Sequence, residues 1–118
     1  VQAVCREVFE ETGLEVQVIE TGCKVDLEYP EQILNPYVIM IEDIHDPVDG
    51  FHQHIDMIYF CKFISHERHL KDGWLWVSRE DILNGVKLSI SGSLPICPPE
   101  DVRLLAERAF DIIENREG

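Results

Sequence analysis

Three glutamates near the beginning of the chain have the residue type and the spacing to bind a divalent cation. Glu7, Glu10 and Glu11 stand at relative positions 0, 3 and 4, which on an α-helix places their side chains on one face. Their carboxylates repel one another, and the negative end of the helix dipole adds to this cost. A hard cation bound through oxygen atoms would offset the repulsion, and Mg²⁺ held in this way keeps positions open for water and phosphate oxygens. The charge pattern alone is also compatible with a solvated acidic face that binds nothing.

The residues around these glutamates predict the helix that presents them. Apolar side chains recur with the helical period at Val1, Val4, Cys5, Val8 and Phe9. Gly13 follows this stripe, as expected of a residue in the left-handed conformation just beyond a helix. We therefore expect a helix that ends near Thr12 and begins upstream of Val1, so that the chain is an N-terminally truncated domain.

The segment REVFEETGL at residues 6–14 resembles the second half of the Nudix box, whose family pattern is G-x5-E-x7-R-E-U-x-E-E-x-G-U with U a bulky apolar residue. Its fixed positions are matched by Arg6, Glu7, Glu10, Glu11 and Gly13, and its apolar positions by Val8 and Leu14. From average residue usage, such a match arises by chance in on the order of one chain in ten thousand. The glycine and first glutamate of the box would lie before Val1.

The resemblance to Nudix hydrolases implies an activity and roles for these residues. The reaction would be Mg²⁺-dependent hydrolysis of the diphosphate bond of a nucleoside diphosphate linked to another moiety, with Mn²⁺ as a substitute cation. Glu10 and Glu11 would be metal ligands, and Glu7 would be a ligand or the base that activates water. Arg6 would hold a glutamate of the cluster through a charge-assisted hydrogen bond. The alternative is a non-catalytic Nudix-like module that binds a nucleotide or a protein.

Other polar residues are candidates for a supporting role. Many Nudix proteins take a further acid from a distant loop, and in the predicted loop at 65–73 we favour Glu67 over Asp72. His52 and His54 alternate on a predicted strand, so they share one face and could line a pocket or act as a base. Solvated or structural roles are more usual for such histidines, and His66 and His69 in the loop do not complete a zinc site.

Aromatic and cysteine side chains favour structural roles. Tyr37, Phe51, Trp74 and Trp76 could stack on a base, although aromatic residues in such patterns belong more often to the hydrophobic core. The four cysteines, Cys5, Cys23, Cys61 and Cys97, include no CxxC pair. We expect free thiols, buried at the two that lie within apolar patterns, Cys5 and Cys61, as is usual in a reducing cytoplasm.

The rest of the chain predicts the elements that would hold the acidic helix in place. The alternating pattern over 14–27 predicts either two strands, around 16–18 and 25–27 on the two sides of a break at Thr21 and Gly22, or one bent strand. Further strands are expected at 36–41 and 74–77, and a buried central strand at 55–64, the most apolar run. Loops are expected at 29–35 and at the acidic, turn-rich segment 42–50. Ser78 should cap a short helix that stops at Gly85, and a last helix should follow Pro98 and Pro99. The fold class is therefore α/β (α+β). The resemblance implies a single Nudix-like α/β/α sandwich over 1–118, with a mixed sheet that lacks its N-terminal strands.

Charge limits the partners. Asp and Glu number 23 against 10 Lys and Arg, a net charge of −13, which disfavours sequence-independent binding to nucleic acids. A small anionic nucleotide remains a suitable substrate if divalent cations lie between it and the protein. No apolar run has the length of a membrane span. The expected free thiols favour a reducing compartment, so we expect a cytoplasmic protein. The expected N-terminal truncation makes a homodimer one possible arrangement.

Overall fold

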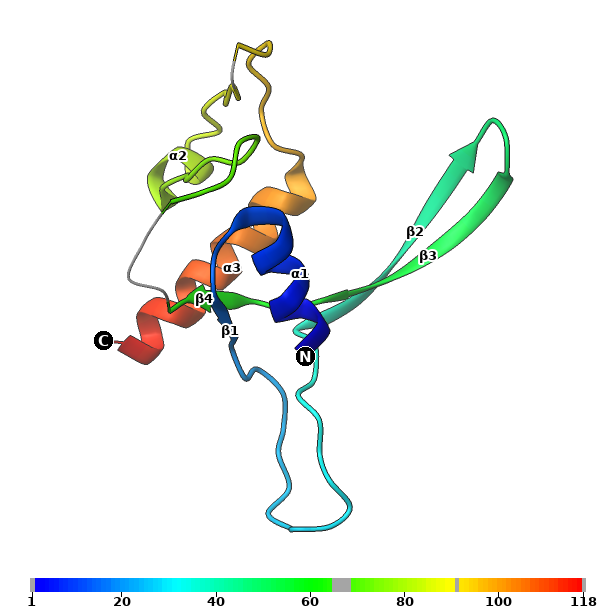
Figure 1. Ribbon diagram of the computed structural model, residues 1–118, viewed down its shortest axis with the longest axis vertical. Coiled ribbons are helices and arrows are strands. Elements are labelled where there is room, and N and C mark those ends of the chain that lie inside the picture. The colour runs from blue at the N-terminus through cyan, green and yellow to red at the C-terminus, as the bar shows by residue number, and fades with distance from the viewer. Residues whose placement is uncertain (1, 65–68, 91, 118) are drawn as a thin grey trace.

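The computed structural model describes residues 2–64, 69–90 and 92–117. The elements, in chain order, are α1 (Gln2–Thr12), β1 (Val16–Val18), β2 (Val38–Asp46), β3 (Gly50–Ile58), β4 (Cys61–Phe63), α2 (Arg79–Leu83) and α3 (Glu100–Glu117) (Figure 1). Helices and antiparallel strands occur together, which confirms the α+β class. Within the described residues the strands pair as two antiparallel ribbons, β1 with β4 and β2 with β3, where the sequence had indicated one mixed sheet.

The short ribbon β1–β4 has helix α1 packed on it. Val18 is opposite Cys61 on one face, and Gln17 is opposite Lys62 on the other. Helix α1 packs against β1. A hollow of about 270 Å³ opens beside the ribbon, and its lining includes Gln17, Val18 and Lys62 of the ribbon and Ile113 of α3. Helix α3 thus borders the ribbon across this hollow.

The hydrophobic core of the described residues is small, and most of it lies in or next to this ribbon. Its members are only 7–8% exposed: Leu14, Val18, Ile19 and Phe60 lie in or beside the ribbon, and Ile82 lies in α2 (Arg79–Leu83). The backbone N–H of Ile19 donates to the carbonyl of Phe60 over 2.7 Å, which extends the contact between the two ribbon strands. Leu14 follows directly after α1, so the C-terminal end of the acidic helix is anchored in the best-buried part of the described chain.

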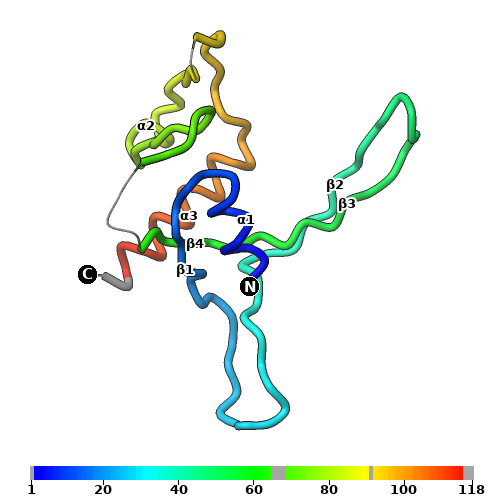
Figure 2. The backbone as a smooth tube through the Cα atoms, viewed as in Figure 1, coloured from blue at the N-terminus to red at the C-terminus, as the bar shows by residue number. Residues whose placement is uncertain are grey.

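The second ribbon is a long hairpin that projects away from the helices (Figures 1 and 2). Its nine paired positions run from Val38 opposite Ile58 to Asp46 opposite Gly50. At the turn the Asp46 carboxylate accepts the backbone N–H groups of Val48 and Asp49, which lower the pKa of Asp46. The prediction of a turn-rich segment over 42–50 is therefore wrong for its first half, since β2 continues to Asp46.

One face of this hairpin is apolar and exposed. Its side chains are between 58% and 67% exposed and are Ile39, Ile41, Phe51, Ile55 and Met57. The apolar run 55–64 is thus not one buried central strand, as predicted. It is divided at Tyr59 and Phe60, so that its first part belongs to the hairpin and its last part is β4. The run is buried only at this division, where the Phe60 ring packs 4.4 Å from the ring of Tyr37.

Two other predicted strands are absent from the described residues. At 25–27 the side chain of Gln32 bonds both the N–H and the carbonyl of Val25, and so takes the place of a neighbouring strand. The segment 74–77 has no strand, and Trp74 and Trp76 are each 49% exposed. The expectation that Trp74, Trp76 and Phe51 belong to the core is therefore wrong, because the ribbons leave these rings at the surface.

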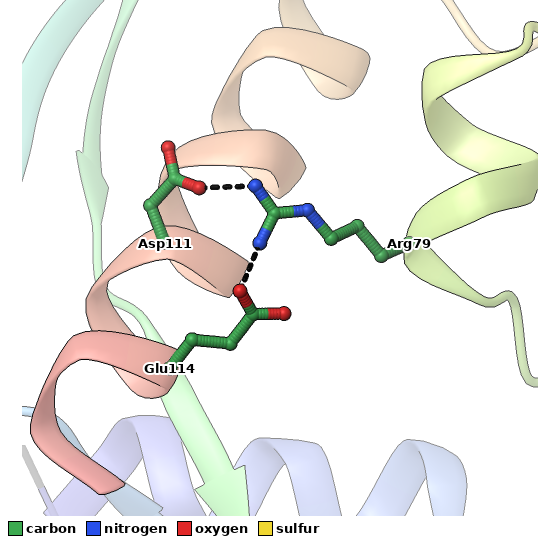
Figure 3. A network of polar contacts seen from close by, with 3 residues as sticks. All are labelled: Arg79, Asp111 and Glu114. Carbon is green, nitrogen blue, oxygen red and sulfur yellow. Dashed lines mark hydrogen bonds and ion pairs between the residues drawn. The ribbon is translucent and has the colours of Figure 1, made fainter. Parts of the chain in front are cut away.

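The two later helices agree with the prediction. The Ser78 hydroxyl accepts the N–H of Asp81 at the start of α2, and Gly85 follows its end with φ +64°. Arg79 of α2 forms ion pairs with Asp111 and Glu114 of α3 (Figure 3). Hydrogen bonds to Glu114 and then Asp111 raise the pKa of the Arg79 guanidinium. These contacts hold α2 on α3.

Helix α3 is the longest helix of the described ranges, with 18 residues. Its first turn carries the acidic residues Glu100 and Asp101, where they interact favourably with the positive end of the helix dipole. Neither α3 nor another helix in those ranges combines the length and apolar character needed to cross a bilayer.

Thiol reactivity tests the packing of α1 on the ribbon. Burial, and secondarily the nearby Cys5 thiol, raises the pKa of Cys61, whereas Cys23 and Cys97 are exposed. Because the thiolate is the reactive form, we expect iodoacetamide at pH 8 to modify Cys23 and Cys97 before Cys61. Peptide mass spectrometry over time would measure this order, and equal rates at the three thiols would contradict the described packing.

Candidate metal site

Helix α1 presents the predicted glutamates at the surface. Glu7, Glu10 and Glu11 lie in its last two turns, and all three are exposed. Their spacing on a regular helix puts the Cβ atoms of Glu7 and its two neighbours about 5–6 Å apart. The three carboxylates are therefore brought to one part of the surface by a single element.

Arg6 forms an ion pair with one of these glutamates. Its Nε lies 3.8 Å from Oε1 of Glu10, and the two side chains are 67% and 64% exposed. The sequence had predicted a charge-assisted hydrogen bond from Arg6 to a glutamate of the cluster. A separation of 3.8 Å exceeds hydrogen-bond length, so the observed contact is an electrostatic pair screened by solvent.

The C-terminal end of α1 is fixed by hydrogen bonds within the chain. Gly13 has φ +83° and donates its N–H to the carbonyl of Phe9 over 2.9 Å. The buried Thr12 donates its hydroxyl to the carbonyl of Val8 and accepts the N–H of Leu14. The helix thus ends where the sequence predicted, and the turn that carries Glu10 and Glu11 continues directly into the core.

A residue distant in the sequence also contacts this helix end. Lys71 donates its backbone N–H to the carbonyl of Thr12 over 3.0 Å and its ammonium to the carbonyl of Glu10 over 2.6 Å. A Cβ atom on Gly13 would lie 3.5 Å from the Cγ of Lys71 and 3.6 Å from the carbonyl oxygen of His69. Sequence reasoning missed Lys71, because nothing local marks a contact that spans 61 residues.

The chemistry of the donor set fits Mg²⁺, since carboxylate oxygens are its usual protein ligands. Among the described residues, however, no three side chains of His, Cys, Asp or Glu already form a group that could hold a metal ion. Glu10 is directed to Arg6, and the three glutamates extend into solvent. Their side chains would have to rotate toward a common point to complete a site.

Two of the other candidates, Glu67 and His66, fall outside the described residues. His52 and His54 share a face of β3, as predicted, with ring centroids 4.9 Å apart. They lie toward the turn end of the hairpin, which extends away from α1 (Figure 1). The structure therefore does not bring these two histidines to the glutamates.

The aromatic candidates are also separate from one another. Phe51 packs on His45 in the hairpin, with ring centroids 5.1 Å apart, and Tyr37 packs on Phe60. Trp76 contacts Phe63 of β4 edge-on at 5.3 Å. These rings do not converge on one surface that could hold a base, so base stacking by any of them stays a prediction.

The geometry at Gly13 generates a stability prediction. Gly13→Ala should lower the free energy of unfolding by about 1–2 kcal/mol, because a residue with a Cβ is strained at positive φ. Gly13→Val should cost more, since its branches reach the side chain of Lys71. Gly73 is the control: its φ is +94°, and no atom lies within 4 Å of an added Cβ. In urea unfolding, the loss of unfolding free energy on going from Ala to Val should therefore be larger at position 13 than at position 73. Equal losses at the two positions would contradict the contact with Lys71.

Comparison with known proteins supports the resemblance found in the sequence. No protein-family model matches the chain, and no curated protein matches it. Among solved structures, the chain is similar to a hydrolase of the NUDIX family from Clostridium perfringens, with a TM-score of 0.61 and 26% sequence identity. The match covers 95% of this chain and 71% of the other. The likeness covers nearly the whole chain, shows the Nudix fold, and supports a Nudix-type hydrolase in general.

Proposed function

We propose that this protein is a pyrophosphohydrolase that acts on the acid anhydride of a nucleoside diphosphate linked to another moiety. The observation that carries the proposal is the placement of REVFEETGL. Its three glutamates occupy the last turns of an exposed helix, and its glycine terminates that helix with positive φ. The structural likeness to a NUDIX family hydrolase supports the coarser part of this proposal, a Nudix-type hydrolase.

The metal would be held by the carboxylates of α1. We infer that Glu10 and Glu11 are direct ligands and that Glu7 is a third ligand or the base. When bound, Mg²⁺, or Mn²⁺ in its place, supplies positive charge that stabilises the charge developing on the diphosphate oxygens.

The chain's own residues would orient the reacting groups. Arg6, paired with Glu10 across one turn, would limit the directions of that carboxylate and share the negative charge of the cluster. If Glu7 is not a ligand, its carboxylate would accept the proton of the attacking water. The bonds of Thr12 and Gly13 at the helix end would keep these side chains on a rigid support, as precise catalysis requires.

The remaining candidates keep their proposed roles. Glu67 is our candidate for the additional loop acid. The net charge of −13 favours a small substrate whose phosphates approach with divalent cations, and disfavours a long nucleic acid. A cytoplasmic location and a homodimer are likewise proposals that rest on the sequence.

The alternative is a non-catalytic Nudix-like module that binds a nucleotide or a protein without hydrolysing it. The two functions are separated by incubating the chain with Mg²⁺ and nucleotide sugars, ADP-ribose or dinucleoside polyphosphates. Release of nucleoside monophosphate that EDTA abolishes would exclude the alternative.

Metal binding by α1 is tested with a double substitution. Glu10→Gln together with Glu11→Gln removes two anionic ligands, so the affinity for Mn²⁺ should fall at least about tenfold. Electron paramagnetic resonance of free Mn²⁺ measures this directly. The matched control is Glu28→Gln with Glu31→Gln, which removes two exposed carboxylates outside α1 and should leave the affinity nearly unchanged. A double variant of α1 that binds Mn²⁺ as tightly as the parent would refute the site.

A further inference from the structure

The last turn of α1 has carbonyl groups that need donors from outside the helix. The final four carbonyls of any α-helix lack partners within it, and in α1 they belong to Phe9, Glu10, Glu11 and Thr12. Gly13 supplies the donor for Phe9. Lys71 alone supplies two more, with its ammonium on Glu10 and its backbone N–H on Thr12. One residue therefore serves two of the four orphan acceptors.

These two bonds act on the residues that carry the carboxylates. The ammonium of Lys71 bonds the backbone of Glu10 itself, a proposed metal ligand. Its aliphatic stem passes beside Gly13, where any larger residue would contact it. These contacts hold the segment 69–73 against the C-terminal end of α1. The Lys71 ammonium therefore lies at the negative end of the helix dipole, where positive charge is stabilising.

We propose that Lys71 is a positioning residue of the metal site. By holding the carbonyls of Glu10 and Thr12 it fixes the last turn of α1, and this sets the directions in which Glu10 and Glu11 extend. It does not bind the metal or the substrate. The inference rests on the proposed function of α1 as a metal-binding helix.

The charge of Lys71 also has an effect that opposes metal binding. A lysine ammonium near a divalent cation repels it, so that its removal would strengthen metal binding if charge were the dominant effect. Lys71 is exposed, and at physiological ionic strength solvent and salt screen such repulsion over about 8 Å. Positioning and repulsion predict opposite signs for the change in affinity, so the sign decides between them.

The experiment compares two substitutions at this position. Lys71→Met keeps the stem but removes the ammonium, and should raise the Mn²⁺ dissociation constant about tenfold, the size typical of lost outer partners at metal sites. Lys71→Arg keeps a charged donor and should restore the affinity to within about twofold. Lys87→Met is the charge control, since it removes one exposed cation distant in sequence from the helix end. The Mn²⁺ dissociation constant of each variant should be measured at two salt concentrations, because salt screens charge repulsion. Circular dichroism verifies that each variant is folded.

Hydrogen exchange of the Gly13 amide gives a second readout that needs no metal. This amide is bonded to the Phe9 carbonyl in the turn that Lys71 holds, so its exchange should accelerate in Lys71→Met and not in Lys71→Arg. Unchanged exchange would overturn the proposal, as would Mn²⁺ binding by Lys71→Met that equals or exceeds the parent's. If the parent itself binds no Mn²⁺, the proposed function fails, and the positioning role fails with it.

Discussion

Repulsion among three carboxylates at the carbonyl end of one helix is the constraint on which the candidate site depends. Glu7, Glu10 and Glu11 occupy the last two turns of α1, where the helix dipole also opposes negative charge. The fold supplies two monovalent cations, Arg6 on the side chain of Glu10 and Lys71 on its carbonyl. Within the described part of the chain neither cation pairs with Glu7 or Glu11. Much of the negative charge is thus left for a divalent ion to neutralise.

The position of this helix in the fold follows from where the chain is buried. Thr12 and Leu14 at its end are among the best-buried residues, and the ribbon β1–β4 packs beside it. A hydrogen-bonded end set in the core makes the last turn of α1 a rigid support. The long hairpin β2–β3 has the opposite character, since its apolar face is exposed and it extends away from the helices (Figure 1). The acidic end of α1 is therefore held by buried neighbours, whereas the hairpin is not.

The features that sequence predicted are those with a local physical cause. Gly13 ends α1 because positive φ suits glycine, and Ser78 begins α2 because its hydroxyl accepts an N–H three residues on. The helical spacing likewise predicted that the three glutamates lie on one helix, as they do in α1. The predictions that were wrong or missing concern features that depend on contacts between residues distant in the sequence. The run 55–64 was divided by the packing of Phe60, and the contact of Lys71 with Glu10 has no local signal at all.

The overall charge of the protein extends the same electrostatic argument to the substrate. A chain with a net charge of −13 repels a diphosphate until cations lie between them. Arg6 and Lys71 are fixed beside the carboxylates, but each already contacts Glu10. Neither side chain is left wholly available to a phosphate, so the proposed function assigns this neutralising role to a divalent cation. The local repulsion on α1 and the net charge of the chain both favour such a cation between the protein and the anionic substrate that we propose.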